Sequence, residues 1–135
     1  MQTKPFLTHD DVARILIAAR QEAQKNNWAV AIAVVDDGGH PLALERLDGC
    51  APIGAYIATE KARTAALGRR ESRLYEEMIN AGRASFLSVP VMSGMLGGGV
   101  PISVDGHVVG AVGVSGVKPE QDAQVASAGV VATQV

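Results

Sequence analysis

Three histidines, His9, His40 and His107, are the side chains best suited to hold a metal or a haem iron, because neutral imidazole is the commonest nitrogen ligand. None has a partner at metal-binding spacing, since the chain contains neither H-x₃₋₅-H nor C-x₂-C. C-x-x-C-H is also absent, which excludes covalent haem attachment. The alternative for each histidine is a solvated polar residue at a helix start or a strand end. No metal site is predicted.

A run of three glycines, Gly97-Gly98-Gly99, provides backbone N–H groups that could cradle a phosphate. The run lacks a following Gly-Lys-Ser/Thr and leads into a strand, which argues against a nucleotide site. The glycines instead clear space for a neighbouring backbone or a flat ligand, and the sequence leaves both open. Lys61 lies in an alanine-rich stretch, where it is either an anion anchor or a solvated lysine paired with Glu60 or another acid.

Groups that could catalyse a reaction are poorly placed. The adjacent carboxylates of Asp36-Asp37 and Glu76-Glu77 diverge on a strand or a helix, so neither pair converges on one substrate. Ser115 lies in Val-Gly-Val-Ser-Gly, which lacks the strand-turn-helix context of a nucleophile. No catalytic residue is identified, and we expect a binding protein before an enzyme.

Two hairpins must position these residues. In the stretch 97–116, β-branched segments flank Asp105-Gly106, a pair typical of a type I′ turn, which would bring Val104 near His107. A second hairpin is predicted from residues 28–35 and 40–46 on either side of the turn at 36–39. Together the hairpins predict a four-stranded antiparallel sheet.

Helical stretches flank both hairpins. Helices are predicted over residues 10–25, with Thr8 as N-cap, and over 53–69, 72–81 and 118–133; residues 83–96 are expected to form a short strand or a loop. Helices before and after each hairpin can cover both faces of one sheet. We therefore predict one α/β domain over residues 1–135, with a central antiparallel sheet between helical layers.

The amino-acid composition restricts the classes of partner that the protein is expected to bind. The chain is 47% apolar, and its 12 basic and 14 acidic residues give a net charge of −2 without a basic stripe, so nucleic acid is not expected. No run reaches the roughly 20 apolar residues that span a bilayer. The single cysteine, Cys50, and the lack of a leader segment indicate a cytoplasmic protein. Alanine-rich helices leave apolar surface that favours a homo-oligomer.

Several motifs occur together in one order between about residues 7 and 131. They are Val34-Val35-Asp36-Asp37-Gly38-Gly39-His40, Arg46-Leu47-Asp48-Gly49, Lys61-Ala62-Arg63-Thr64-Ala65, Gly98-Gly99-Val100-Pro101-Ile102, Asp105-Gly106, Val109-Gly110-Ala111-Val112-Gly113-Val114-Ser115-Gly116 and Gln121-Asp122. This set resembles the GlcG/HbpS-type haem-binding family, which includes the C-terminal domain of the propanediol-utilisation corrinoid adenosyltransferase. The resemblance implies a profilin-like α/β/α fold and assembly into dimers or larger oligomers.

The resemblance also implies a function. Some members bind haem or a related tetrapyrrole, and many are accessory to a catabolic pathway, so we expect non-covalent binding of haem or another small planar ligand. The candidate binding residues are His40, His9, His107, Lys61, Gly98 and Gly99. One alternative is an enzyme or accessory factor acting on a small organic acid or a diol-pathway cofactor, with Lys61 or Arg63 as the anion anchor. The other alternative is a purely structural role in assembly.

Overall fold

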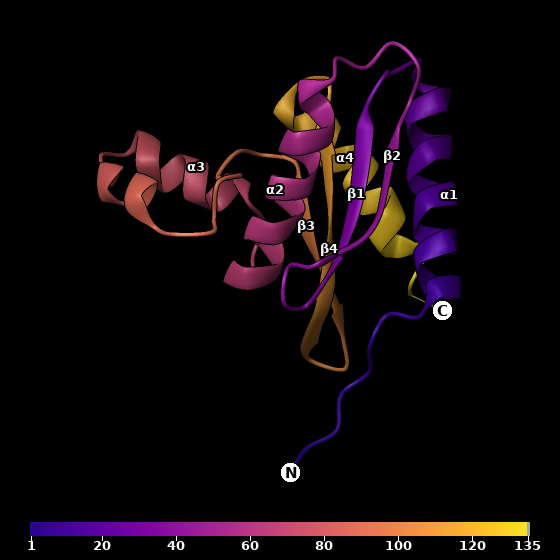
Figure 1. Cartoon of the computed structure of the whole chain (residues 1–135), viewed down its shortest axis with the longest axis horizontal. Coiled ribbons are helices and arrows are strands. Elements are labelled where there is room, and N and C mark those ends of the chain that lie inside the picture. The colour runs from indigo at the N-terminus through magenta and orange to yellow at the C-terminus, as the bar shows by residue number, and fades with distance from the viewer. Residues whose placement is uncertain (135) are drawn as a thin grey trace.

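Two β-hairpins lie side by side in the computed structural model, which describes residues 1–134, and form one antiparallel sheet (Figure 1). The strand order is β2-β1-β4-β3, so the central pair joins one strand from each hairpin. The elements in chain order are α1 (His9–Lys25), β1 (Ala31–Asp36), β2 (Pro41–Arg46), α2 (Ile53–Gly68), α3 (Arg73–Asn80), the 3₁₀ helix η1 (Ala84–Ser88), β3 (Gly99–Val104), β4 (His107–Ser115) and α4 (Pro119–Val131). The predicted four-stranded sheet is confirmed.

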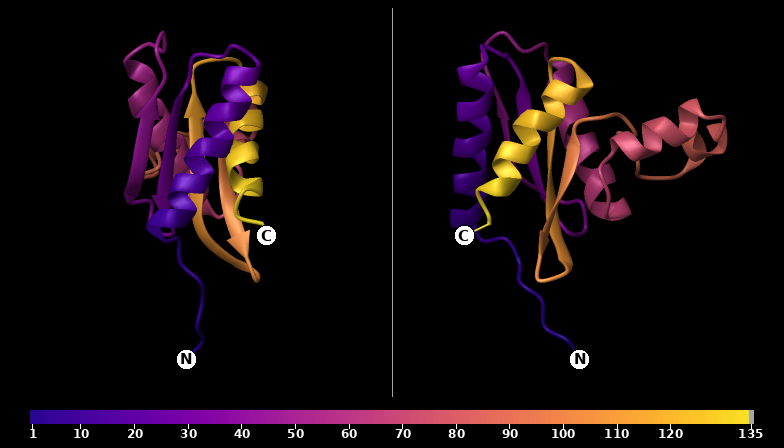
Figure 2. Two further views of the ribbon diagram at one scale, coloured as in Figure 1. Left: turned by 90° about the vertical axis from the view of Figure 1, so that its right-hand side faces the viewer. Right: turned by 180° about the vertical axis from the view of Figure 1, so that it is seen from behind.

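Helices cover both faces of this sheet, as predicted. α1 and α4 lie side by side on one face, and α2 lies on the other (Figure 2). α3 and η1 belong to an arm, residues 73–96, that projects from the α2 side of the molecule (Figure 1). Among the described residues, no helix is long and apolar enough to cross a membrane.

Local sequence accounts for the start of α1. The side chain of Thr8 accepts a hydrogen bond from the backbone N–H of Asp11, and the Asp11 carboxylate accepts one from the N–H of Thr8 at 2.8 Å. This reciprocal capping box satisfies two of the N–H groups that a helix start leaves unpaired. Val12, Ile15 and Ala19 then fall on one buried face, as helical periodicity requires.

The turn of the second hairpin has the predicted type. Asp105 and Gly106 have φ angles of 52° and 79°, and Val104 pairs with His107. Both central residues of a type I′ turn need a positive φ, which glycine adopts freely and aspartate tolerates. The turn thereby fixes the register between β3 and β4, apart from one irregularity between Ile102 and Ser103.

The arm differs from its prediction. Residues 83–96 were expected to be a strand or a loop, whereas residues 84–88 form the short 3₁₀ helix η1. Tyr75 is the buried side chain of α3, and its ring lies 5.7 Å from that of Phe86. This aromatic contact holds η1 against α3, a pairing that no sequence period indicates.

Candidate functional site

The three histidines lie at one end of the molecule, although they are far apart in sequence. His9 begins α1, His40 ends the turn between β1 and β2, and His107 begins β4. The start of α1 and both hairpin turns lie at the end where the N-terminal segment leaves the body (Figure 1). No group of three or more His, Cys, Asp or Glu side chains within residues 1–134 could hold a metal ion together. Each histidine is thus a separate candidate ligand.

His40 has an oriented imidazole ring. Its Nδ1 lies 3.2 Å from Oδ1 of Asp36, and the same oxygen accepts the backbone N–H groups of Gly38 and His40 at 2.9 Å each. A carboxylate only accepts, so Nδ1 carries the proton in this contact and Nε2 of the neutral ring keeps its lone pair. The side chain is 80% exposed, which leaves Nε2 open to a ligand. A carboxylate behind the ring is the arrangement that orients metal-binding histidines.

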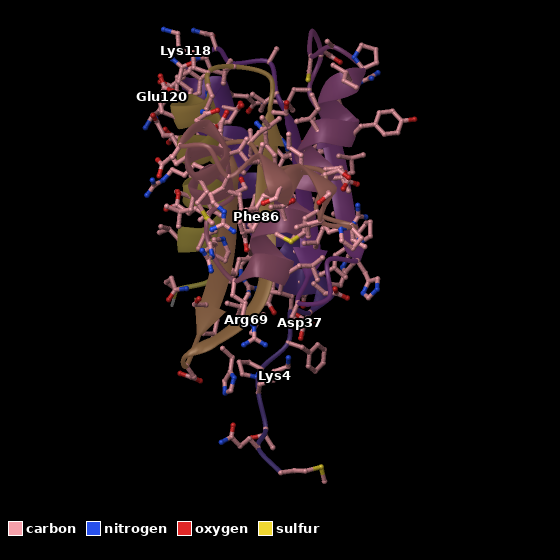
Figure 3. The ribbon with its side chains drawn as sticks, turned by 90° about the vertical axis from the view of Figure 1, so that its left-hand side faces the viewer. Lys4, Asp37, Arg69, Phe86, Lys118 and Glu120 are labelled. Atoms are coloured by element: carbon pink, nitrogen blue, oxygen red, sulfur yellow. The ribbon has the colours of Figure 1, made fainter. Side chains whose placement is uncertain are left out.

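His9 and His107 lack such support. His9 is exposed and His107 is half-buried, and neither ring makes a hydrogen bond to another described residue. Lys4, Asp37 and Arg69 lie at the same end (Figure 3), and Lys4 forms an ion pair with Asp37. Of the three histidines, His40 is therefore the one whose ring is oriented by a neighbouring side chain.

An apolar groove lies between the edge strand β2 and α2. Its volume is about 610 Å³, and it is lined by Leu44, Arg46, Pro52, Ala55, Tyr56, Thr59 and Glu60. Leu44 is 51% exposed and Tyr56 is 75% exposed, so both present large apolar surfaces to solvent. Leu44 pairs with Ala33, whose side chain contacts the α2 layer, so Leu44 faces the same side. We call this feature the β2–α2 groove.

Another exposed apolar side chain lies on β2 between the β2–α2 groove and His40. Leu42 is on the same face of β2 as Leu44 and is also exposed. At the turn, a Cβ built on Gly39 would lie 3.5 Å from Cγ of Leu67, so the C-terminal part of α2 touches the residue next to His40. Exposed apolar side chains therefore lie between the groove and the oriented imidazole.

Lys61 lies in the interior instead of in solvent. It is 4% exposed, and its Nζ donates to the carbonyl of Val114 and to Oδ2 of Asp122, each at 3.0 Å. Burial raises the pKa of Asp122, and the opposing attraction of Lys61 favours its charged form. The expectation of a solvated lysine paired with Glu60 is wrong, because Glu60 pairs with Arg63 and the partner of Lys61 comes from α4.

Gly98 and Gly99 pack against that lysine. A Cβ on Gly98 would lie 2.8 Å from Nζ of Lys61, and one on Gly99 would overlap the Lys61 carbonyl. Of the two explanations that the sequence left open, close approach of a neighbouring backbone is the one present here. The six predicted binding residues therefore form two groups: the histidines at one end, and Lys61, Gly98 and Gly99 inside. A ligand-binding role for either group stays a prediction.

Sequence reasoning missed three contributors to these sites. The divergence of Asp36 from Asp37 excludes that pair from catalysis on sequence grounds, although the spacing of four residues between Asp36 and His40 across a turn is a usable signal. Leu44 and Tyr56 gave no signal, because an alternating strand and an alanine-rich helix do not show which faces stay uncovered. The edge position of β2 decides that exposure.

Comparisons with known proteins agree with this architecture. The family model described as "Haem degrading protein HbpS-like" matches residues 7–131. Protein GlcG of Escherichia coli K12 is 60% identical over 115 residues, covering 85% of each chain. Protein ORFY of Klebsiella pneumoniae superposes with a TM-score of 0.92 at 27% identity, over 100% of this chain and 95% of that one.

A haem complex is among the similar solved structures. The crystal structure of the PduOC–haem complex has a TM-score of 0.85 and 25% identity, over 95% of each chain. The family match spans nearly the whole chain, and the GlcG relative exceeds half identity over most of its length. This protein therefore belongs to the HbpS-like family.

Proposed function

We propose that this protein binds haem or a related tetrapyrrole non-covalently, and that His40 would hold the iron while the apolar side chains of β2 and α2 would contact the macrocycle. The observation that carries the proposal is the imidazole of His40, held by Asp36 with Nε2 open to solvent. The family match and the similarity to a PduOC–haem complex support haem as the ligand.

Haem iron, when bound, supplies an open coordination position that an imidazole nitrogen can fill. The Asp36 carboxylate holds the proton on Nδ1 of His40, which leaves the lone pair of Nε2 for the iron. The exposed faces of Leu42, Leu44 and Tyr56 give apolar surface to a flat ligand. Arg46 lines the same groove and offers a guanidinium to a carboxylate on the ligand's edge.

A haemin titration followed at the Soret band tests this proposal. We expect a saturable shift with the wild-type chain and its loss in His40→Ala. His9→Ala and His107→Ala are matched controls, because both remove a histidine from the same end of the molecule. If the shift persists in His40→Ala and disappears in one of the controls, the histidine replaced in that control binds the iron instead. The absence of any shift in the wild-type chain would refute haem binding.

Asp36→Asn tests the positioning role of the carboxylate. The amide oxygen can still accept the turn's N–H groups, but the negative charge behind His40 is lost. We expect haemin affinity to fall by about tenfold while the fold is retained. Unchanged affinity would show that Asp36 only shapes the turn.

The alternative of an organic-acid site anchored by Lys61 or Arg63 receives less support. Lys61 is buried against Asp122, and Arg63 pairs with Glu60 and donates Nε to the carbonyl of Gly39 at 3.2 Å. Both cations therefore already form ion pairs with carboxylates of this chain. A thermal-shift screen with small organic acids, repeated on Arg63→Ala, checks this alternative.

The proposal includes assembly into a homo-oligomer with an accessory role in the cytoplasm. Leu87, Val91 and Leu96 on the arm are large apolar side chains exposed to solvent, and such patches favour protein contacts. A single cysteine suits a reducing compartment. Light scattering should give a mass that is a multiple of 14.0 kDa. A monomer mass at micromolar concentration would contradict self-association.

A further inference from the structure

A second cavity lies at the opposite end of the sheet, where β4 ends and α2 begins. Its volume is about 590 Å³, and its lining includes Trp28, Cys50, Ile53, Ser115 and Val117. No carboxylate and no cation is among the lining residues, all of which the structure describes. The β2–α2 groove does not include Ser115 or Trp28 and has a separate lining.

Ser115 contributes a hydroxyl without a partner. The residue is 8% exposed, and its Oγ makes no hydrogen bond to any of residues 1–134. Ser115 pairs with Ala31, whose side chain belongs to the layer under α2, so the hydroxyl faces α2 and the cavity. No fully buried side-chain oxygen or nitrogen among the described residues lacks a partner, so the Ser115 oxygen is open to water or to a ligand in the cavity. The hydroxyl therefore marks a place for a polar group inside the cavity.

The helix α2 directs its N-terminal end at the same space. α2 has 16 residues and begins at Ile53 after Pro52, which provides no side-chain cap. The N–H groups of Gly54 and Ala55 make turn hydrogen bonds to the carbonyls of Ala51 and Pro52, at 2.9 and 3.2 Å. The positive end of the helix dipole is not matched by an acidic side chain in the first turn. A helix end of this kind favours a negative group.

The thiol of Cys50 also lines the cavity, next to the start of α2. Its Sγ lies 3.8 Å from the carbonyl oxygen of Ser115, close to where a Cβ on Gly54 would lie. Burial raises the pKa of Cys50, so the thiol stays protonated and adds no negative charge to the cavity. Asp122 is near, but Lys61 matches its charge. The remaining walls, from Trp28, Ile53 and Val117, are apolar.

We propose that this cavity binds the carboxylate of a small organic acid, with the Ser115 hydroxyl as hydrogen-bond donor, the positive end of the α2 dipole beside the carboxylate and the apolar walls around its carbon skeleton. The site does not depend on haem binding, because none of its lining residues also lines the β2–α2 groove. It also differs from an anion site at Lys61 or Arg63, since neither lines this cavity.

The single tryptophan, Trp28, lines the cavity and reports on it directly. Titration with propionate, followed by Trp28 fluorescence, should give a saturable change, whereas the neutral isostere propionamide should give none. Ser115→Ala should weaken the propionate response about tenfold or more, since a hydrogen bond to a charged group is lost. Ser103→Ala is the matched control, because Ser103 is exposed on β3 and does not line the cavity.

Amide chemical shifts of the wild-type chain provide a measurement that does not depend on a variant's folding. Propionate should shift the amide resonances of Ile53, Ser115 and Gly116 and leave those of the β3–β4 turn unchanged. A non-saturable response, an equal response to propionamide, or shifts spread over the surface would overturn the proposal. So would tight binding of inorganic phosphate without propionate binding. Haemin titration of Ser115→Ala should match the wild type, which separates failure here from failure of the haem proposal.

Discussion

The two faces of the sheet are packed in different ways. The face under α1 and α4 is filled by branched side chains, including Ile15, Ile32 and Ile102. The face under α2 is built from alanines and glycines, and a Cβ on Gly113 would overlap the Ala58 carbonyl. The branched side chains separate the backbones of α1 and α4 from the sheet. The backbone of α2, in contrast, packs directly against the backbone of the sheet. Among its buried apolar side chains the close face has Val35 but is otherwise made of alanines, and a buried ion pair joins it to α4.

Different changes should therefore damage the two faces. A core of interdigitated branched side chains is harmed when volume is removed, because a cavity remains. A face of small residues in backbone contact is harmed when volume is added, because the helix must move. The ion pair between Lys61 and Asp122 is sensitive to the loss of one charge. Three stability measurements test this contrast, and a fourth provides a reference outside both faces.

Removal of one partner from the buried ion pair should have the largest effect. Asp122→Ala leaves the Lys61 ammonium buried and unpaired, and we expect unfolding free energy to fall by about 3–5 kcal/mol in urea denaturation. Glu120→Ala, an exposed acid in the first turn of the same helix, is the control and should change stability little. The double variant Lys61→Met with Asp122→Leu should recover much of the loss. A cost below about 1 kcal/mol for Asp122→Ala would show that the ion pair does not lock this face.

Loss of a large side chain on the α1 face comes next. Ile15 is fully buried, and Ile15→Ala should lower the unfolding free energy by about 2–5 kcal/mol through lost transfer energy and a residual cavity. Ile17→Ala on the same helix is the matched control, because Ile17 is 46% exposed. Equal midpoints for the two variants in chemical denaturation would contradict the assignment of the core face.

Addition of one carbon to the α2 face should cost somewhat less. Gly113→Ala places a methyl group against the backbone of Ala58 and Ala62, and we expect a loss of about 1–3 kcal/mol. The contrasting change is Ile15→Val, which removes one carbon from the other face and should cost about 0.5–1.5 kcal/mol. Thermal unfolding monitored by circular dichroism measures both. A stabilised Gly113→Ala would show that α2 moves away from the sheet at no cost.

The smallest effect should come from the cap of α1, which lies outside both packed faces. Thr8→Ala removes the side chain that accepts the Asp11 N–H, and should lower the unfolding free energy by about 1 kcal/mol.

Hydrogen bonds from Thr8, with help from Arg14, lower the pKa of Asp11 in the folded chain. The contribution of Asp11 is therefore present above the ordinary carboxyl range and is lost as pH falls through the lowered pKa. The penalty in Thr8→Ala should shrink in acid, and a pH-independent penalty would exclude a role for the Asp11 charge.

Local features were predictable because each depends on neighbouring residues. Asp105-Gly106 indicated a type I′ turn, and both residues have the positive φ that it requires. Thr8 and Asp11 indicated the start of α1. The fold class followed, since two hairpins between helices have few ways to bury both faces of a sheet. Among the candidate site residues, the sequence predicts His40 but not the contact of its ring with Asp36, and the binding role of His40 stays a prediction.

The sequence by itself determined the turns, the helix start and the apolar faces, because these depend on contacts within a few residues. Only the tertiary structure decided the pairing of β1 with β4, the meeting of Lys61 with Asp122 and the gathering of three histidines at one end. Periodicity shows which face of an element is buried but not which partner covers it. Lys61 illustrates this limit of sequence patterns. A charged lysine is usually exposed to solvent, and the carboxylate of Asp122, 61 positions away along the chain, allows this one to be buried.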